Sequence, residues 1–120
     1  MAKIRIVCET AGVELTATLN DSHTARELMG ILPVEGAAQR WGDEVYFGVP
    51  LELGAESPVE SVAVGDIGYW PPGSAFCAFF GQQPYSAVNP LGSVEGDALV
   101  FDAVGDGDLV RLEAADVAKV

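Results

Sequence analysis

The side chains whose types suggest a binding site gather in one stretch of the sequence, GDIGYWPPGSAFCAFFGQQP, at residues 65–84. Five aromatic residues stand there among prolines and glycines, and the stretch contains no Lys or Arg: Tyr69, Trp70, Phe76, Phe79 and Phe80. Aromatic rings beside amides on glycine-rich loops commonly line small pockets. The composition indicates either a hairpin of the core or the wall of a groove that holds an apolar ligand.

Alternation along the strand predicted at residues 75–80 assigns its side chains to two faces. Successive side chains of a strand point to opposite sides, so Phe76 and Phe80 share one face, which we expect to fill the core. The opposite face carries Cys77 and Phe79. That face must meet a helix, a loop or a ligand, because it is apolar as well.

The sequence therefore predicts a shallow pocket outside the core. Its expected ligand-binding residues are Trp70, Cys77, Phe79 and Gln82. Two prolines at positions 71 and 72 fix the φ angles of the loop, so the indole of Trp70 should be held in place before anything binds. Phe79 is expected to matter more for binding than for stability, because its side chain faces away from the core.

The other groups with chemical potential fit structural interpretations better. The lone His23 follows Asp21 and Ser22, but neighbours in sequence do not generally form a catalytic triad, and the sequence has no G-x-S-x-G elbow. The segment DAVGDGD at residues 102–108 departs from the residue order of a calcium loop and reads as a solvated turn. We expect no catalytic residue, no metal site and no cofactor.

Composition and charge set the class of protein. The chain has 120 residues, of which 49% are hydrophobic and 20% charged, so we expect one domain over residues 1–120 with its own core. The formal net charge of −12 disfavours nucleic acid and anionic membrane surfaces as partners, since their phosphates would be repelled. Cys8 and Cys77 lie far apart and are expected to be reduced thiols. No apolar run suggests a signal peptide or a membrane span, so we expect a cytoplasmic protein.

Most of the chain shows the period-two alternation of half-buried strands. The alternation is clearest in KIRIVCE at residues 3–9, VELTATL at 13–19 and LVRLEAA at 109–115. Further strands are expected on both sides of the Gly42-Asp43 turn and of the PPGS turn at residues 71–74.

One segment changes to a helical period. Thr24 and Glu27 fit a capping box, and the helix predicted at residues 24–32 ends before Pro33. ALVFDAV at residues 98–104 fits either a second short helix or a strand. Many short strands with glycine turns and few helices indicate a closed antiparallel barrel or a sandwich, and closing a barrel removes its exposed edges.

Four motifs together resemble the cyclophilin-like family of small bacterial and archaeal proteins: SHTARELMGILP, RWGDEVYFGVP, GDIGYWPPGSAFCAFFG and NPLGSVEGD. The wider resemblance is to the cyclophilins, which are peptidyl-prolyl isomerases. Their G-S-x-F-F segment is matched by Gly73, Ser74 and Phe76, and their T-A-x-x-F helix start is matched by Thr24 and Ala25. The resemblance implies a mainly β fold, a closed antiparallel eight-stranded β-barrel capped by helices.

Departures from the cyclophilin pattern bear on activity. The family's catalytic arginine stands on the strand after the first helix, where this sequence reads VYFGVP and has no Arg. Cys77 replaces the second Phe of the pair, which floors the proline pocket. Isomerisation faces a barrier of ~20 kcal/mol, and the cationic donor that would lower it is missing from its place. We therefore do not expect isomerase activity.

Three functions remain open. The first is a non-catalytic barrel that binds a peptide segment or a small apolar ligand. The second is an enzyme, either a peptidyl-prolyl isomerase in which Arg40 or Arg26 replaces the missing arginine or a different reaction in the same groove. Arg40 is for this reason added to the ligand-binding candidates. The third is a non-catalytic subunit of a larger complex, with its apolar strip buried against a protein partner.

Overall fold

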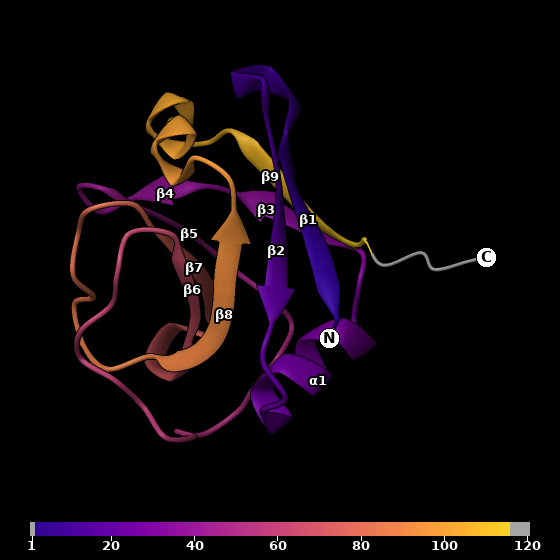
Figure 1. Ribbon diagram of the computed structural model, residues 1–120, viewed down its shortest axis with the longest axis vertical. Helices are drawn as coiled ribbons and strands as arrows, with labels where there is room; N and C mark the ends of the chain where they lie inside the picture. The colour runs from indigo at the N-terminus through magenta and orange to yellow at the C-terminus, as the bar shows by residue number, and fades with distance from the viewer. Residues whose placement is uncertain (1, 116–120) are drawn as a thin grey trace.

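The computed structural model describes residues 2–115 and shows a mainly β protein (Figure 1). One antiparallel sheet contains nine strands in the order β3-β9-β1-β2-β8-β6-β7-β5-β4. The strands are β1 (Lys3–Cys8), β2 (Val13–Leu19), β3 (Val34–Ala37), β4 (Gln39–Arg40), β5 (Glu44–Gly48), β6 (Asp66–Trp70), β7 (Ala75–Phe79), β8 (Asn89–Glu95) and β9 (Leu109–Ala114). The helical segments are α1 (His23–Gly30) and the short 3-10 turns η1 (Glu9–Ala11), η2 (Pro71–Gly73) and η3 (Ala98–Ala103).

The barrel closes through the segment that contains β3 and β4. These strands lie at opposite ends of the sheet, with β3 beside β9 and β4 beside β5, yet only Ala38 separates them in the chain. The chain therefore passes directly from one edge of the sheet to the other. Counted as one interrupted strand, β3 and β4 bring the total to eight, so the predicted barrel is confirmed.

Gly36 lets the two edges of the sheet approach each other at this seam. A Cβ atom at Gly36 on β3 would lie 2.8 Å from Cδ2 of Phe47, which stands on β5. The phenyl ring of Phe47 thus packs directly on the backbone of β3. Side-chain packing at this point supplements the covalent link through Ala38.

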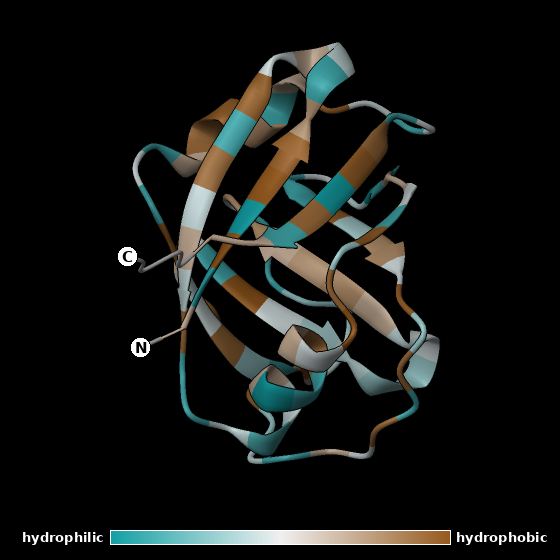
Figure 2. Ribbon diagram, turned by 90° about the vertical axis from the view of Figure 1, so that its right-hand side faces the viewer, coloured by the Kyte–Doolittle hydropathy of each residue, from teal (hydrophilic) through white to brown (hydrophobic). Residues whose placement is uncertain are grey.

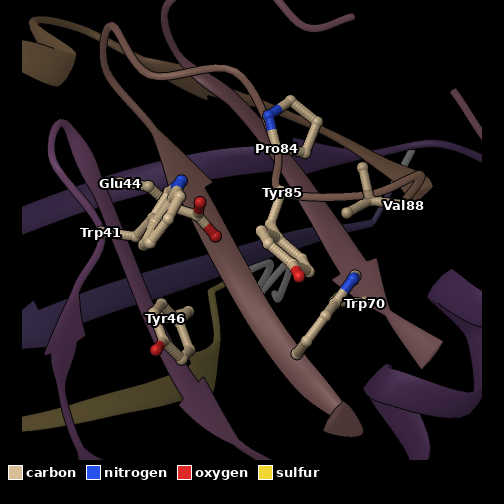
Figure 3. Close-up of a pocket in the computed structure, with 7 residues that line it drawn as sticks. All are labelled: Trp41, Glu44, Tyr46, Trp70, Pro84, Tyr85 and Val88. Carbon is tan, nitrogen blue, oxygen red and sulfur yellow. The ribbon is translucent and has the colours of Figure 1, made fainter. Parts of the chain in front are cut away.

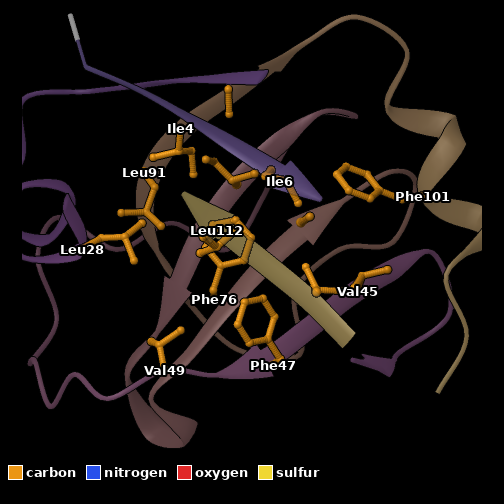
Figure 4. Packing of buried hydrophobic residues seen from close by; sticks show 14 of the residues in the cluster. Ile4, Ile6, Leu28, Val45, Phe47, Val49, Phe76, Leu91, Phe101 and Leu112 are labelled. Atoms are coloured by element: carbon orange, nitrogen blue, oxygen red, sulfur yellow. The ribbon is translucent and has the colours of Figure 1, made fainter. Parts of the chain in front are cut away.

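The inside of the barrel is filled by aliphatic and aromatic side chains (Figure 4). Phe76 lies there with 2% of its surface exposed, and its ring centroid is 5.8 Å from that of Phe47. Phe80 belongs to the same core, as the alternation predicts. Alternation of hydrophilic and hydrophobic residues along the strands is visible in Figure 2.

The two ends of the barrel are covered by short helices. Leu28 of α1 enters the core at one end, and Phe101 of η3 enters it at the other (Figures 1 and 4). The segment at residues 98–104, for which helix and strand were both open, is therefore helical over Ala98–Ala103. No helix in residues 2–115 combines the length and the apolar character that crossing a membrane requires.

The N-terminus of α1 is capped by different residues from those predicted. Ser22 is the N-cap, and its Oγ accepts a hydrogen bond from the backbone N–H of Ala25 at 3.1 Å. Thr24 is buried, and its hydroxyl lies 2.7 Å from a carboxylate oxygen of Glu56. The predicted capping box of Thr24 with Glu27 is wrong, because a carboxylate from a distant loop occupies the helix N-terminus.

Glu56 and Asn89 tie the long loop at residues 49–65 to the barrel. The Glu56 carboxylate accepts hydrogen bonds from the backbone N–H groups of His23 (3.0 Å) and Thr24 (2.8 Å). The buried side chain of Asn89, at the start of β8, accepts from the N–H of Glu56 and donates to Thr24 Oγ1 and to the carbonyl of Gly54. The hydroxyl and the two N–H groups lower the pKa of Glu56 to about 2, since they favour its charged form.

The outer face of β7 is buried as well. Ala75, Cys77 and Phe79 form a second apolar cluster with Val88, and partly buried side chains from the loops pack against it. A backbone bridge between Val59 and Val88 holds the two covering loops together. This outer cluster is therefore roofed by loops, which is one of the arrangements that the apolar outer face required.

We predict that Phe76→Ala lowers the free energy of unfolding by about 3–5 kcal/mol, because the barrel cannot collapse fully around the cavity that it leaves. Phe79→Ala should also be costly, since Phe79 is only 1% exposed, which revises the sequence-based expectation for this residue. Urea denaturation of both variants measures the two costs. A loss below about 1 kcal/mol for Phe79→Ala would show that the outer cluster does not contribute as a packed core.

We predict that Glu56→Gln lowers the melting temperature at pH 7. A carboxyl with a lowered pKa stabilises the folded state above its ordinary pKa of 4.5, and this contribution is lost as the pH falls toward 2. The difference between the wild type and Glu56→Gln should therefore shrink over that range in thermal unfolding followed by circular dichroism. Glu60→Gln, in the same loop and exposed, is the matched control. A pH-independent difference would contradict the assigned role.

Candidate functional site

The loops that cover the outer cluster leave a hollow of about 170 Å³ (Figure 3). It lies beside β5, between the β4–β5 turn, the end of β6 and the segment that connects β7 to β8. Six apolar or aromatic residues and one acidic residue line it: Trp41, Glu44, Tyr46, Trp70, Pro84, Tyr85 and Val88. The hollow is thus a mostly aromatic site with a single charged group.

The aromatic rings around the hollow are arranged edge to face. The ring of Tyr85 lies between the two indoles, with centroid distances of 5.7 Å to Trp41 and 6.2 Å to Trp70 and interplanar angles of 86° and 87°. This geometry is one that aromatic pairs prefer. Tyr85 is nevertheless 75% exposed and Trp41 44% exposed. Large aromatic side chains grouped at the surface around a hollow are a common mark of a binding site.

Trp70 is held in place from three sides. Its indole Nε1 donates a hydrogen bond of 2.6 Å to Ser86 Oγ, and its ring meets Tyr85. A Cβ atom at Gly73 would lie 2.5 Å from Cζ3 of the indole, so the ring rests directly on the backbone of η2. The position of the indole is therefore fixed by contacts within the protein itself.

Glu44 supplies the charge of the site. Backbone hydrogen bonds of 3.0 and 3.1 Å between Trp41 and Glu44 close the tight turn before β5, and the side chain points into the space beside the Trp41 ring (Figure 3). Only 6% of Glu44 is exposed. Within residues 2–115, no Lys, Arg or His forms an ion pair with this carboxylate.

Burial raises the pKa of the Glu44 carboxyl above its ordinary value, although the neighbouring Cys77 thiol acts in the opposite direction. Burial and the neighbouring Glu44 charge together raise the pKa of the Cys77 thiol well above its ordinary value. Cys77 is thus a neutral thiol beneath the hollow, and its Sγ donates to the backbone carbonyl of Ala75 at 3.8 Å. The Glu44 carboxylate has no cationic partner from the described part of the chain and lies in low-dielectric surroundings.

Four of the five sequence-predicted site residues lie in or near the hollow and fall into three groups. Trp70 lines the hollow. Cys77 and Phe79 lie beneath it, 2% and 1% exposed, and belong to the outer cluster. Gln82 packs against the backbone of Gly42.

Arg40 does not line the hollow. Its guanidinium donates hydrogen bonds to the backbone carbonyls of Gly42, Asp102 and Val104, and its Cζ lies 5.0 Å from the centroid of the Phe80 ring. Arg40 thus joins the β4–β5 turn to η3 at the barrel end.

Sequence reasoning missed six of the seven lining residues, namely Trp41, Glu44, Tyr46, Pro84, Tyr85 and Val88. The alternation of β5 places Glu44 and Tyr46 on one face, which is the signal that could have found two of them. Pairing of Tyr46 with Cys77 across β5 and β7 puts that face beside the outer cluster. Nothing local in the sequence indicates that Trp41 and Tyr85 meet.

Other surface depressions have fewer features of a binding site. A larger one on β1, β2 and β9, of about 510 Å³, is lined by charges that pair with one another, among them Arg5 and Arg111 with Glu113. Over residues 2–115, no group of three or more His, Cys, Asp or Glu side chains could hold a metal ion. The aromatic hollow is therefore the candidate functional site.

Comparison with known proteins shows the family to which this barrel belongs. The family model described as Cyclophilin-like matches residues 2–113, so the chain belongs to the cyclophilin-like family. The solution structure of the protein AF2241 from Archaeoglobus fulgidus is 34% identical, with a TM-score of 0.79 and 95% of each chain covered.

A second structure, that of McbB in complex with tryptophan, is 19% identical, with a TM-score of 0.79, and therefore shares the fold. The alignment covers 98% of this chain and 46% of McbB, so this chain spans about half the length of that protein. A comparison with curated proteins found no match.

We predict that Glu44→Gln raises the melting temperature at pH 7. Since burial raises the pKa of Glu44 in the folded state, the folded protein binds this proton more tightly than the unfolded chain does. The ionised carboxylate therefore costs stability above the raised pKa, and the cost disappears as the pH falls below the ordinary value of 4.5.

Thermal unfolding from pH 7 to pH 4 checks this prediction. The difference between Glu44→Gln and the wild type should shrink with falling pH, which is opposite to the destabilisation expected for Glu56→Gln. Glu52→Gln, at an exposed position, serves as the control for loss of one negative charge. Equal melting temperatures at pH 7 would show that the carboxylate is adequately solvated in the hollow.

Proposed function

We propose that this cyclophilin-like protein is a non-catalytic binding module that holds one ring-sized group of a small ligand or of a peptide in its aromatic hollow. The observation that carries the proposal is the set of pre-positioned rings of Trp41, Trp70 and Tyr85 around an open apolar space. The indole of Trp70 is fixed by Ser86 and Gly73 without any ligand. Binding therefore costs little ordering of this side chain.

The size of the hollow limits what it can hold. An apolar cavity of about 150 Å³ accommodates a molecule the size of benzene, whereas sites for drug-sized ligands start at about 300 Å³. With about 170 Å³, the hollow suits a single ring, a branched head group or one side chain. A longer peptide would contact the surface around it rather than enter.

The residues at the site support binding rather than turnover. None of the seven residues that line the hollow in the described structure carries a positive charge, so no guanidinium is available beside a bound prolyl nitrogen. The guanidinium of Arg40 is already engaged by three backbone carbonyls and by Asp102. Both cysteines are unpaired and buried, which supports the cytoplasmic location that we propose.

Intrinsic fluorescence offers a direct test, because both tryptophans of the chain line the hollow. We expect indole, tryptophan or a proline-containing peptide to change the emission on titration. Trp70→Ala and Tyr85→Ala should weaken the binding of the best compound by about tenfold or more, since each ring contributes roughly 0.5–1.5 kcal/mol beyond its buried area. Leu109→Ala, at an exposed apolar position on β9, should leave the affinity unchanged.

The enzymatic alternative is tested on the same preparation. We expect no acceleration of the cis–trans isomerisation of an Ala-Pro peptide above the uncatalysed rate. Clear acceleration that Arg40→Ala abolishes would favour an isomerase with a relocated arginine. Binding that survives Trp70→Ala and Tyr85→Ala unchanged would place the ligand elsewhere on the barrel.

A further inference from the structure

We infer that the group held in the hollow is a cation, namely an alkylated ammonium ion enclosed by the aromatic rings and paired with Glu44. This inference rests on the proposed function, because it requires the hollow to be a binding site. The inference goes beyond the proposed function by naming the charge and the chemical class of the ligand.

The walls of the hollow suit such an ion. The faces of Trp and Tyr rings carry negative quadrupole potential and attract cations, with Trp the strongest, and clusters of these rings recognise quaternary ammonium groups. Here two indoles and two phenol rings surround the space: Trp41, Trp70, Tyr46 and Tyr85. Val88 and Pro84 complete an apolar wall that methyl groups could contact.

Glu44 gives the site its preference for positive charge. A carboxylate that is 6% exposed, and that has no ion-pair partner from residues 2–115, is unfavourable by itself. The Cys77 thiol beside it is a weak donor, and it donates to the backbone carbonyl of Ala75 at 3.8 Å. The guanidinium of Arg40, on the adjacent strand β4, donates instead to the backbone carbonyls of Gly42, Asp102 and Val104. A bound cation would supply the missing partner.

An alkylated ammonium fits better than other cations. A primary ammonium needs several hydrogen-bond acceptors, and the hollow presents one carboxylate among apolar rings. A metal ion needs several ligands, and no cluster of three candidate ligands exists in the described part of the chain. A methylated ammonium spreads its charge over apolar surface and requires few acceptors. The net charge of −12 would also steer cations toward the protein.

The test compares choline with its uncharged carbon analogue, in which a quaternary carbon replaces the nitrogen. The two compounds have the same shape, so the difference in affinity isolates the charge. Titrations are followed by tryptophan fluorescence and by NMR chemical shifts of the indole N–H groups. We expect choline to bind about tenfold or more tightly than the analogue, as desolvated cation–π contacts allow.

Variants at carboxylates define the role of Glu44. Glu44→Gln should weaken choline binding about tenfold or more and leave the affinity for the analogue within about twofold. Glu27→Gln removes one exposed negative charge on α1 and should change neither, so it controls for net charge. Because Glu44→Gln is expected to be more stable than the wild type, its loss of choline binding would not reflect unfolding.

The outcomes separate this inference from the proposed function. If the analogue binds as tightly as choline, or if only indole binds, the cation assignment is wrong and the binding site stands. If neither choline and its analogue nor indole, tryptophan and the proline-containing peptide bind at millimolar concentration, the cation assignment and the proposed binding function are both wrong. If choline binds as inferred, a trimethyllysine peptide identifies the source of the ammonium group. If the peptide binds tenfold more tightly than choline, the natural ligand is a methylated side chain of a protein. If the peptide and choline bind equally, the natural ligand is a free small cation.

Discussion

Burial of both faces of β7 is the constraint on which the rest of the structure depends. Phe76 and Ala78 point into the barrel, while Ala75, Cys77 and Phe79 point out of it, and all five are buried. A barrel alone covers only the inner face. The outer face is covered by two loops, at residues 49–65 and 80–88, which together form a roof over it. Polar contacts hold this roof in place, among them the bridge between Val59 and Val88 and the network of Glu56, Thr24 and Asn89.

The candidate site exists because the roof is incomplete. It leaves a hollow open beside Glu44 and Tyr46 of β5, and most of the side chains around this hollow are aromatic or apolar. A carboxylate placed there loses much of its hydration without gaining a cationic partner from the described residues. Groups that cost stability in the free protein are common at binding sites, because a ligand can offset the cost. Glu44 and the exposed ring of Tyr85 are both of this kind.

The scaffold of this cyclophilin-like barrel depends on few features of the sequence. The closed sheet and its helical ends need only apolar alternation and the link through Ala38 from β3 to β4. β5 (EVYFG) contains no arginine, and the sheet forms without one. The same strand can then carry another group, and here it carries Glu44 and Tyr46 toward the hollow.

The sequence by itself determined the elements that depend on local pattern. Period-two alternation predicted the strands and assigned Phe76 and Phe80 to the core and Cys77 and Phe79 to the opposite face, because side-chain direction in a strand follows from backbone geometry alone. Only the tertiary structure decided how the site is composed. Trp41 and Tyr85 meet because β5 pairs with β7 and a loop folds across that pair, and Glu56 replaces Glu27 at the helix N-terminus because the roof brings it there. These contacts join residues far apart in the chain, and their energies depend on which surfaces must be covered, which no local pattern records.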